Sequence, residues 1–172
     1  MNIQLLPLRE EDTIAFKEEI QEAFQQGFQA HFPNEEGNNL WQVLPDKDFY
    51  QSLNAEGAEA YEAIDTDGQR KGGAIIVIDH ETHHGELAFL YVKVGVQSKG
   101  IGQAIWKAIE TIHPETEVWE TCTPYFDRRN IHFYINRCGF HAVEFFNEHH
   151  PDPNMPEQFE QGDGLFRFVK VK

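Results

Sequence analysis

Two glycines, Gly100 and Gly102, stand where a hydrophobic segment gives way to an apolar helical pattern. The segment before them, Leu87–Val92, has the composition of a strand, and Lys99 precedes the first glycine. A strand, a glycine turn and a helix can bind an anion, because the first N–H groups of the helix point outwards with the positive end of its dipole. Glycine lets the anion approach the backbone closely. The sequence therefore predicts a phosphate-binding turn at residues 97–102.

Two commoner phosphate loops do not match this turn. A Walker loop requires Gly-Lys followed by Ser or Thr after a longer gap, and a dinucleotide fingerprint requires a third glycine that opens a parallel βαβ unit. A tight strand-to-helix turn would also explain two glycines. The interpretation therefore depends on the neighbouring motifs.

Two motifs in the right order supply that context. In the stretch 90–102, Leu-Tyr-Val is followed after four residues by Gln-x-x-Gly-x-Gly. This stretch resembles the coenzyme A-binding motif of the GNAT superfamily of acyl-coenzyme A-dependent N-acyltransferases. In the stretch 133–140, Phe-Tyr is followed after three residues by Cys-Gly-Phe. This resembles the second motif of the superfamily, a helix that carries Tyr and precedes Gly-Phe at the next strand. The resemblance covers residues 85–146.

The resemblance implies that acetyl-CoA is the cosubstrate. Backbone groups of Val92 and Val94, on a strand that splays from its neighbour, would pair with the pantetheine arm, and amides of the glycine turn would hold the pyrophosphate. Many members bind the coenzyme through an Asn seven residues before the helix Tyr. This chain has Asp127 there, and Asn130 one turn later could take over. The expected coenzyme-binding residues are Val92, Val94, Gln97, Ser98, Lys99, Gly100, Ile101, Gly102 and Asn130.

The resemblance also implies two catalytic side chains and a backbone donor. Tyr134 would stand beside the coenzyme sulfur and protonate the leaving thiolate, since a phenol with a pKa of about 10 suits a thiolate that titrates in a similar range. The alternative role of this ring is packing of the helix onto the sheet. A backbone N–H near Val92 would polarise the thioester carbonyl. Glu86 stands where the histone-acetylating branch has its catalytic Glu, so it is the first candidate for the base.

The face of the strand decides whether Glu86 can serve as this base. Strand alternation predicts that Glu86 shares a face with Ala88, Leu90 and Val92 and could point into the cleft. A solvated carboxylate at a strand end is the alternative. Glu120, on the following strand, is a rival whose face the sequence does not settle, and a water chain to another base also stays open.

Metal and thiol chemistry are not favoured. The three histidines within 79–84 lie beside acidic residues, but they occupy a predicted hairpin connection and lack a zinc-binding pattern. We therefore expect no metal. Cys122 and Cys138 fall inside regular segments and are expected to be buried, reduced thiols. No His or Asp is recognisably placed to activate either thiol, which argues against a covalent acyl-enzyme.

The composition predicts a single acidic domain spanning residues 1–172. The 172 residues include 29 acidic and 14 basic side chains, for a formal net charge of −15. This charge should repel nucleic acid and anionic lipid and would favour a cationic acceptor, although solubility explains it equally well. We expect a cytoplasmic protein without a membrane segment, because the amino terminus lacks a basic leader and no long apolar run occurs.

Hydrophobic periodicity gives the order of the elements. Strands are expected at 2–8, 58–65, 73–79, 86–94, 117–123, 140–146 and 165–171, and helices from Asp12 to about 28, after Pro45 to 53, and at 100–112 and 128–138. The core faces of the two longest helices are predicted to be Ile14, Phe16, Ile20, Ala23, Phe24 and Phe28, and Ile101, Ile105, Ala108, Ile109 and Ile112. Together with the resemblance, this order predicts an α/β protein with a GNAT-like three-layer fold, in which helices flank a mixed, mostly antiparallel sheet of about seven strands.

The predicted function is N-acetylation of a primary amine by direct transfer from acetyl-CoA in a ternary complex. The alternative is a non-catalytic acyl-CoA-binding or regulatory module on the same fold. Phe28, His31, Phe32 and Trp41 lie in a region that often walls the acceptor site in the superfamily, although core packing would also explain them. The acceptor is a small-molecule or peptide amine that the sequence does not identify, and formation of a homodimer stays open.

Overall fold

A computed structural model describes residues 2–31, 43–96, 100–153 and 164–172. Its elements follow the predicted order. They are β1 (Gln4–Pro7), the 3-10 helix η1 (Glu10–Asp12), α1 (Thr13–His31), α2 (Asp46–Leu53), β2 (Ala58–Ile64), β3 (Arg70–Asp79), β4 (His84–Val92), α3 (Ile101–Ile112), β5 (Val118–Pro124), α4 (Arg128–His132), the π-helix η3 (Phe133–Arg137), β6 (His141–Phe146) and β7 (Leu165–Val171). The predicted helix 128–138 is thus α4 continued by one π-helical turn.

The strands form one seven-stranded sheet in the order β1-β2-β3-β4-β5-β7-β6. Every neighbouring pair is antiparallel except β4 and β5, which are parallel and are joined through α3. A parallel pair requires such a crossover connection, whereas β2, β3 and β4 follow one another through short turns. The mixed, mostly antiparallel sheet predicted from the sequence is therefore confirmed.

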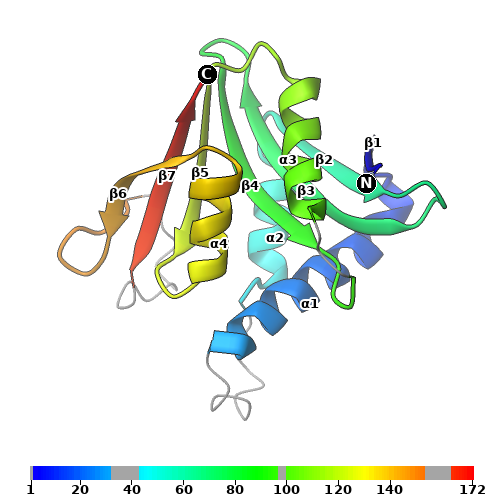
Figure 1. Cartoon of the computed structure of the whole chain (residues 1–172), viewed down its shortest axis with the longest axis horizontal. Coiled ribbons are helices and arrows are strands. Elements are labelled where there is room, and N and C mark those ends of the chain that lie inside the picture. Colours follow the sequence, from blue (N-terminus) through cyan, green and yellow to red (C-terminus); the bar gives the residue numbers. More distant parts are fainter. Residues whose placement is uncertain (1, 32–42, 97–99, 154–163) are drawn as a thin grey trace.

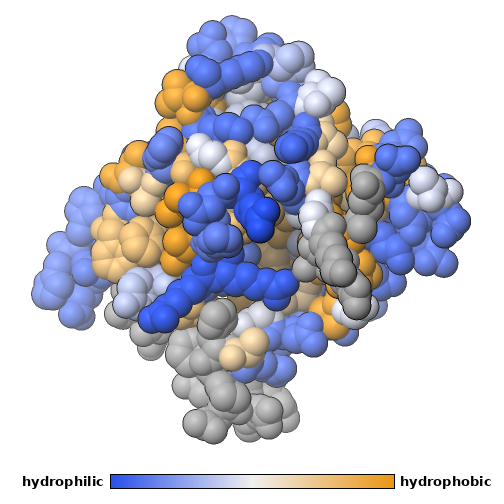
Figure 2. All heavy atoms as spheres, viewed as in Figure 1, coloured by the Kyte–Doolittle hydropathy of each residue, from blue (hydrophilic) through white to orange (hydrophobic). Residues whose placement is uncertain are grey.

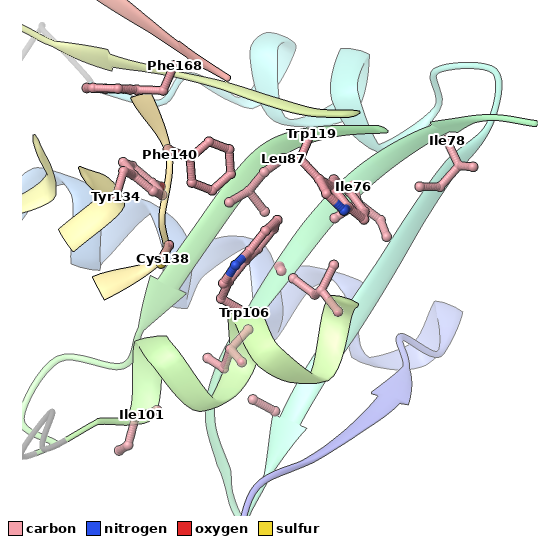
Figure 3. Close-up of a cluster of buried hydrophobic side chains, with 14 residues drawn as sticks. Ile76, Ile78, Leu87, Ile101, Trp106, Trp119, Tyr134, Cys138, Phe140 and Phe168 are labelled. Atoms are coloured by element: carbon pink, nitrogen blue, oxygen red, sulfur yellow. The ribbon is translucent and has the colours of Figure 1, made fainter. Parts of the chain in front are cut away.

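Helices cover both faces of the sheet, which gives the three expected layers (Figure 1). On one face, α3 and the region around α4 enclose a cluster that includes Ile105, Trp106 and Trp119 (Figure 3). On the other face, α1 and α2 enclose a second cluster around Phe16, Ile20 and Phe49. Figure 2 shows that hydrophilic side chains dominate the surface in that view, consistent with the acidic composition.

Details at the helix ends differ from the predictions. Ile14 is 63% exposed, because residues two apart lie on nearly opposite sides of a helix and Phe16 occupies the buried side. Ile112, in the last turn of α3, is 39% exposed, whereas Trp106 is fully buried and was not predicted. Asp12 does not cap α1. It lies in the 3-10 helix that leads directly into α1, and its carboxylate accepts a hydrogen bond from Arg9 at 2.9 Å.

The histidine-rich hairpin between β3 and β4 is a hydrogen-bonded turn. Asp79 accepts hydrogen bonds from the backbone N–H groups of Glu81 and Thr82, at 3.0 and 3.2 Å, and His84 is the first residue of β4. Among the described residues, no three His, Cys, Asp or Glu side chains are grouped so that they could hold a metal ion. Within the same ranges, none of the helices has the length and apolar character needed to cross a membrane.

Candidate active site

The two parallel strands separate soon after they begin to pair. Backbone pairing between β4 and β5 covers only three positions and ends at Glu86 and Glu120, although β4 continues to Val92 and β5 to Pro124. In Figure 1 the two strands lie side by side at the top of the view and diverge towards the bottom. We call the gap between them, from Leu87 and Thr121 onwards, the splay. Its closed end is the point at which the pairing stops. The splay that the resemblance implied is present.

The backbone of β4 offers unpaired positions to the splay. The N–H of Lys93 donates to the carbonyl oxygen of Lys71 on the β3 side at 2.9 Å. Because neighbouring strand residues direct their backbone groups to opposite sides, the N–H and C=O groups of Val92 face the splay. Val94 is not on the strand as predicted. It lies in a turn closed by a hydrogen bond from the Val96 N–H to the Lys93 carbonyl oxygen at 3.2 Å, so its role in binding stays a prediction.

The glycine turn places its two glycines in different surroundings. Gln97, Ser98 and Lys99 lie outside the described residues. Gly100 precedes α3 with a φ of +82°, which favours glycine, and among the described residues, its chain neighbours aside, no atom lies within 4 Å of the position a Cβ would take. A Cβ on Gly102 would instead meet the Phe133 ring at 3.2 Å. Gly102 therefore allows α3 to pack closely against Phe133, and its role in coenzyme binding stays a prediction.

Tyr134 lies in the core beside the splay. Its side chain is 6% exposed, and its ring packs against Phe140 and Phe168 with centroid distances of 5.7 and 5.9 Å (Figure 3). It belongs to the π-helical turn, in which the Cys138 N–H donates to the Phe133 carbonyl oxygen. π-Helical turns are frequent at functional sites. Burial raises the pKa of the Tyr134 phenol, which therefore stays protonated at neutral pH.

Thr121 lies at the closed end of the splay. It is the first residue of β5 beyond the last pair with β4, and its buried hydroxyl donates to the Leu87 carbonyl oxygen at 2.9 Å. Burial raises the pKa of the Tyr134 phenol, and Thr121 acts on this pKa in the opposite direction. The sequence analysis missed Thr121, because a threonine in a strand carries no signal of such a position.

A β-bulge changes the predicted face of β4. Ile75 pairs with Phe89 and Ile76 with Leu87, so Ala88 is an extra residue. Ala88 packs on the cluster under α1 and α2, whereas Leu90 and Val92 pack on the α3 side. Leu87 also belongs to the α3 side, so its neighbour Glu86 faces the side of α1 and α2. The prediction that Glu86 shares a face with Leu90 and Val92 is therefore wrong.

Glu86 and Glu120 lie together on this face, which we call the acceptor face. Trp119 belongs to the core on the α3 side, so Glu120 points to the opposite side, which the sequence could not settle. Solvent reaches Glu86, but crowding within the sheet face desolvates its carboxyl group and the nearby charge of Glu120 adds to the effect, so its pKa is raised. His84 acts in the opposite direction. A raised pKa favours a carboxylate that accepts a proton.

A ladder of ion pairs crosses the acceptor face from β4 to β6. His84 contacts Glu120 at 3.1 Å, and Arg167 on β7 binds Glu120 at 3.0 Å and Glu144 at 2.9 Å. His150 contacts Glu144 at 2.7 Å. The guanidinium group of Arg167 is thus shared by two carboxylates. The ladder holds β5, β7 and β6 together and gives this face a surplus of acidic groups.

Comparison with known proteins decides the family. The sequence model of the Acetyltransferase (GNAT) family matches residues 16–140, which is most of the chain and includes the splay, the glycine turn and Tyr134. The chain belongs to the GNAT acetyltransferase family. This GNAT protein is also 42% identical over 170 residues to the uncharacterized protein YrkN of Bacillus subtilis (strain 168), a match that covers 95% of this chain and 90% of YrkN.

Solved structures share the fold of this GNAT protein. A Bacillus subtilis acetyltransferase in complex with CoA superposes with a TM-score of 0.65 at 19% identity, covering 99% of this chain and 97% of the other. A GNAT family acetyltransferase from Elizabethkingia anophelis with acetyl-CoA bound gives a TM-score of 0.69 at 14% identity, covering 99% of each chain. The seven-stranded sheet flanked by helices is therefore the GNAT fold, and family membership makes this protein an acyltransferase.

The GNAT protein differs from the expected pattern at the start of α4. Asp127 caps the helix by accepting the Asn130 N–H at 3.1 Å, and the Asn130 side-chain amide donates to the same carboxylate at 2.8 Å. Asp127 and Asn130 therefore act together in a helix cap. Coenzyme binding by Asn130 stays a prediction.

The cysteines differ from each other. Cys138 is buried as predicted, but Cys122 is exposed on the acceptor face, because β5 alternates and its neighbours Thr121 and Thr123 take the buried side. Desolvation and the charge of Glu120 raise the pKa of Cys122 to about 12. Its thiol is therefore protonated at neutral pH and poorly suited to act as a nucleophile.

A separate cavity of about 830 Å³ lies between β1, α1 and the β2–β3 hairpin. Its lining includes Glu19, Glu62 and Arg70, but no residue of β5, α3 or α4. The cavity is therefore distinct from the splay and from Tyr134, where the resemblance predicts the active site.

Proposed function

We propose that this protein is an N-acetyltransferase that moves an acetyl group from acetyl-CoA to a primary amine of a cationic acceptor, by direct transfer in a ternary complex. The observation that carries the proposal is the splay, with Tyr134 and Thr121 at its closed end and Glu86 at the adjoining edge of the acceptor face. An open strand edge beside a buried phenol fits a thioester that pairs with β4.

The described residues fit the coenzyme. Backbone groups of Val92 facing the splay would pair with the pantetheine arm, and the first N–H groups of α3, after Gly100, would receive the pyrophosphate. Acetyl-CoA supplies the activated acyl group as a thioester. The proposal keeps the coenzyme-binding residues expected from the sequence, including those of the turn 97–99.

The chemistry uses one acid and one base. The amine nitrogen forms a bond to the thioester carbonyl carbon, and the C–S bond breaks. The departing thiolate takes the proton of Tyr134, while the proton lost by the amine passes to Glu86, directly or through water. A backbone N–H near Val92 would stabilise the charge that develops on the carbonyl oxygen. Holding amine and thioester in line supplies much of the rate, on the order of 7 to 11 kcal/mol at best.

Direct transfer is favoured over a covalent acyl-enzyme because Cys122, the cysteine on the acceptor face, is a poor nucleophile. Its pKa of about 12 leaves little thiolate at neutral pH. Kinetics that require both substrates together, rather than a ping-pong pattern, would support direct transfer.

The ion-pair ladder supports a cationic acceptor. Arg167 is already bound by Glu120 and Glu144, so it is poorly placed to hold a carboxylate of the acceptor. The connections 32–45 and 147–164, which follow α1 and β6, contain acidic residues and neither Lys nor Arg. An acceptor with a second ammonium group should therefore be preferred over one that carries a carboxylate.

The first test is calorimetric titration with acetyl-CoA, followed by a thiol-release assay with three matched amines. We expect micromolar binding and a kcat/KM that decreases from 1,4-diaminobutane to 1-aminobutane to 4-aminobutanoate. An equal rate with all three amines would contradict the cationic acceptor. Binding without transfer to any amine would favour the second candidate, a non-catalytic acyl-CoA-binding module, and absence of binding at millimolar concentration would contradict both.

Replacing Glu86 with glutamine should lower kcat/KM in a pH-dependent way. The carboxylate works as a base only above its raised pKa, and an aliphatic amine is largely protonated below a pH of about 10. The loss of kcat/KM should therefore be largest at a pH between the pKa of Glu86 and the pKa of the amine. It should shrink as the pH approaches the pKa of the amine. The measurement is a pH profile of kcat/KM for both proteins.

Glu120→Gln is the matched control for this prediction, since Glu120 is the neighbouring carboxylate on the same face. If Glu120→Gln alone showed the pH-dependent loss, the base would be Glu120. If Glu86→Gln matched the wild type at every pH, Glu86 would have no part in proton transfer.

A further inference from the structure

The end of β4 beside the splay is held by backbone bonds from one side. Beyond Glu86, β4 no longer pairs with β5, and its pairing with β3 continues to Val92, which lies opposite Gly72. The Lys93 N–H donates to the Lys71 carbonyl oxygen on the same side at 2.9 Å. Because the open side of Val92 has no strand partner, its position depends on the contacts of the residues that flank it.

The side chains that flank Val92 both reach α1. Strand alternation directs Tyr91 and Lys93 to the face under α1, and Tyr91 belongs to the buried cluster on that face. Tyr91 is 2% exposed, and its hydroxyl donates to one carboxylate oxygen of Glu19 at 2.9 Å. The Lys93 ammonium group lies 3.9 Å from the other oxygen of Glu19, a long and partly exposed contact that contributes little. One carboxylate on α1 therefore contacts both neighbours of Val92.

Glu19 is itself held in a fixed orientation. Arg70, the first residue of β3, donates to both of its carboxylate oxygens, at 3.0 and 3.1 Å. Arg70 also binds Glu62 on β2, so the guanidinium group is anchored from two elements. A carboxylate held by a bidentate guanidinium group has a defined geometry. Glu19 is therefore a rigid acceptor for the Tyr91 hydroxyl, not a mobile surface side chain.

We propose that Glu19 is a positioning residue for coenzyme binding, which through Tyr91 holds the end of β4 where Val92 can pair with the pantetheine arm. The inference rests on the part of the proposed function in which the coenzyme lies along β4, and it adds α1 to the elements that support this site. Without the contact, the end of β4 would be ordered only when the coenzyme binds, and this ordering would weaken binding. Chemistry in the saturated complex should be little affected.

The first test uses Tyr91→Phe, which removes the hydroxyl and leaves the ring packed against Phe16. Because the lost hydrogen bond has a charged acceptor, we expect the Kd for free coenzyme A and the KM for acetyl-CoA to rise by about tenfold, with kcat within about twofold of the wild type. Calorimetry and steady-state kinetics provide the measurements. Tyr61→Phe is the matched control, since it removes a tyrosine hydroxyl that donates to Glu59 on β2, and its Kd should stay within about twofold.

A double-mutant cycle tests whether Tyr91 acts through Glu19. Glu19→Ala should also weaken coenzyme A binding, and adding Tyr91→Phe should weaken it no further. Glu62→Ala removes the other carboxylate bound to Arg70 and should leave the Kd within about twofold, even if the protein unfolds at lower urea. Multiplicative losses in the double mutant would overturn the proposal, as would equal weakening by Glu62→Ala. If Glu19→Ala did not fold, equal Kd values for Tyr91→Phe and Tyr61→Phe would still overturn it.

Amide hydrogen exchange tests the positioning without any coenzyme. In the free Tyr91→Phe protein, NMR should show about tenfold faster exchange of the Lys93 amide, whereas the Ile78 amide, bonded to the Gly57 carbonyl oxygen, should be unchanged. Unchanged exchange at Lys93, or equal acceleration at both amides, would overturn the inference. A wild-type protein that binds coenzyme A but transfers nothing would contradict the proposed function, and the binding and exchange results would still decide the role of Glu19. Absence of binding by the wild type would overturn both.

Discussion

Tyr134→Phe is expected to lower kcat by about tenfold or more, while the Kd for acetyl-CoA stays within a few-fold of the wild type. The phenol is buried beside the splay, and its raised pKa keeps it protonated at any ordinary assay pH, which suits a proton donor. Phenylalanine fills almost the same space between Phe140 and Phe168, so the core should be preserved. Steady-state kinetics with a good amine acceptor and calorimetry with acetyl-CoA provide the two measurements.

Tyr125→Phe is the control, because Tyr125 is 53% exposed and its ring packs with Phe145 and Phe166. This substitution should leave kcat unchanged. Since Tyr134 stays protonated, the wild type should not lose activity through this group as the pH rises towards 10. Unchanged turnover in Tyr134→Phe would remove Tyr134 from the mechanism and leave it the packing role that its burial also explains.

Arg70→Met should reduce the free energy of unfolding by about 3 kcal/mol, the low end of the range for breaking a buried ion pair. The Arg70 side chain is 13% exposed and binds Glu19 through two hydrogen bonds, at 3.0 and 3.1 Å, and also Glu62. Glu19 also accepts the Tyr91 hydroxyl at 2.9 Å. Removing the guanidinium group leaves two carboxylates facing each other with little access to water. Urea denaturation measures the loss.

Two comparisons distinguish charge from packing in this network. Arg9→Met removes a guanidinium group from the exposed pairs with Glu11 and Asp12, and it should leave the unfolding midpoint nearly unchanged. Adding Glu19→Gln and Glu62→Gln to Arg70→Met should recover part of the lost stability, because no carboxylate then remains unpaired. An Arg70→Met protein as stable as Arg9→Met would show that the network contributes little.

Local patterns in the sequence were sufficient to predict the helices and strands and some of the candidate site residues. Apolar residues recur every second residue in strands and every three or four in helices, so the order of the strands and helices follows from short stretches of chain. The glycine at position 100 and the Tyr134 motif are also local, since each depends on residues a few positions apart. The last strand, Leu165–Val171, was predicted to the residue.

The tertiary structure alone decided how the strands meet. The bulge at Ala88 depends on register against β3, and it moved Glu86 to the face opposite Leu90 and Val92. The splay depends on where β4 and β5 stop pairing, which gives Thr121 its position. Periodicity within one segment contains no information on register between segments, because a shift of one residue preserves the pattern and reverses every side chain.

The same limit applies to residues that are far apart in the chain. Arg167 joins Glu120 and Glu144 only because β7 lies between β5 and β6. Gly102 contacts Phe133 only because α3 and the π-helical turn pack on the same face of the sheet. The sequence by itself therefore determined the family, the elements and the residue types available for acyl transfer. The packing of distant segments determined which of these residues lie together, since those contacts form only when the strands are assembled into one sheet.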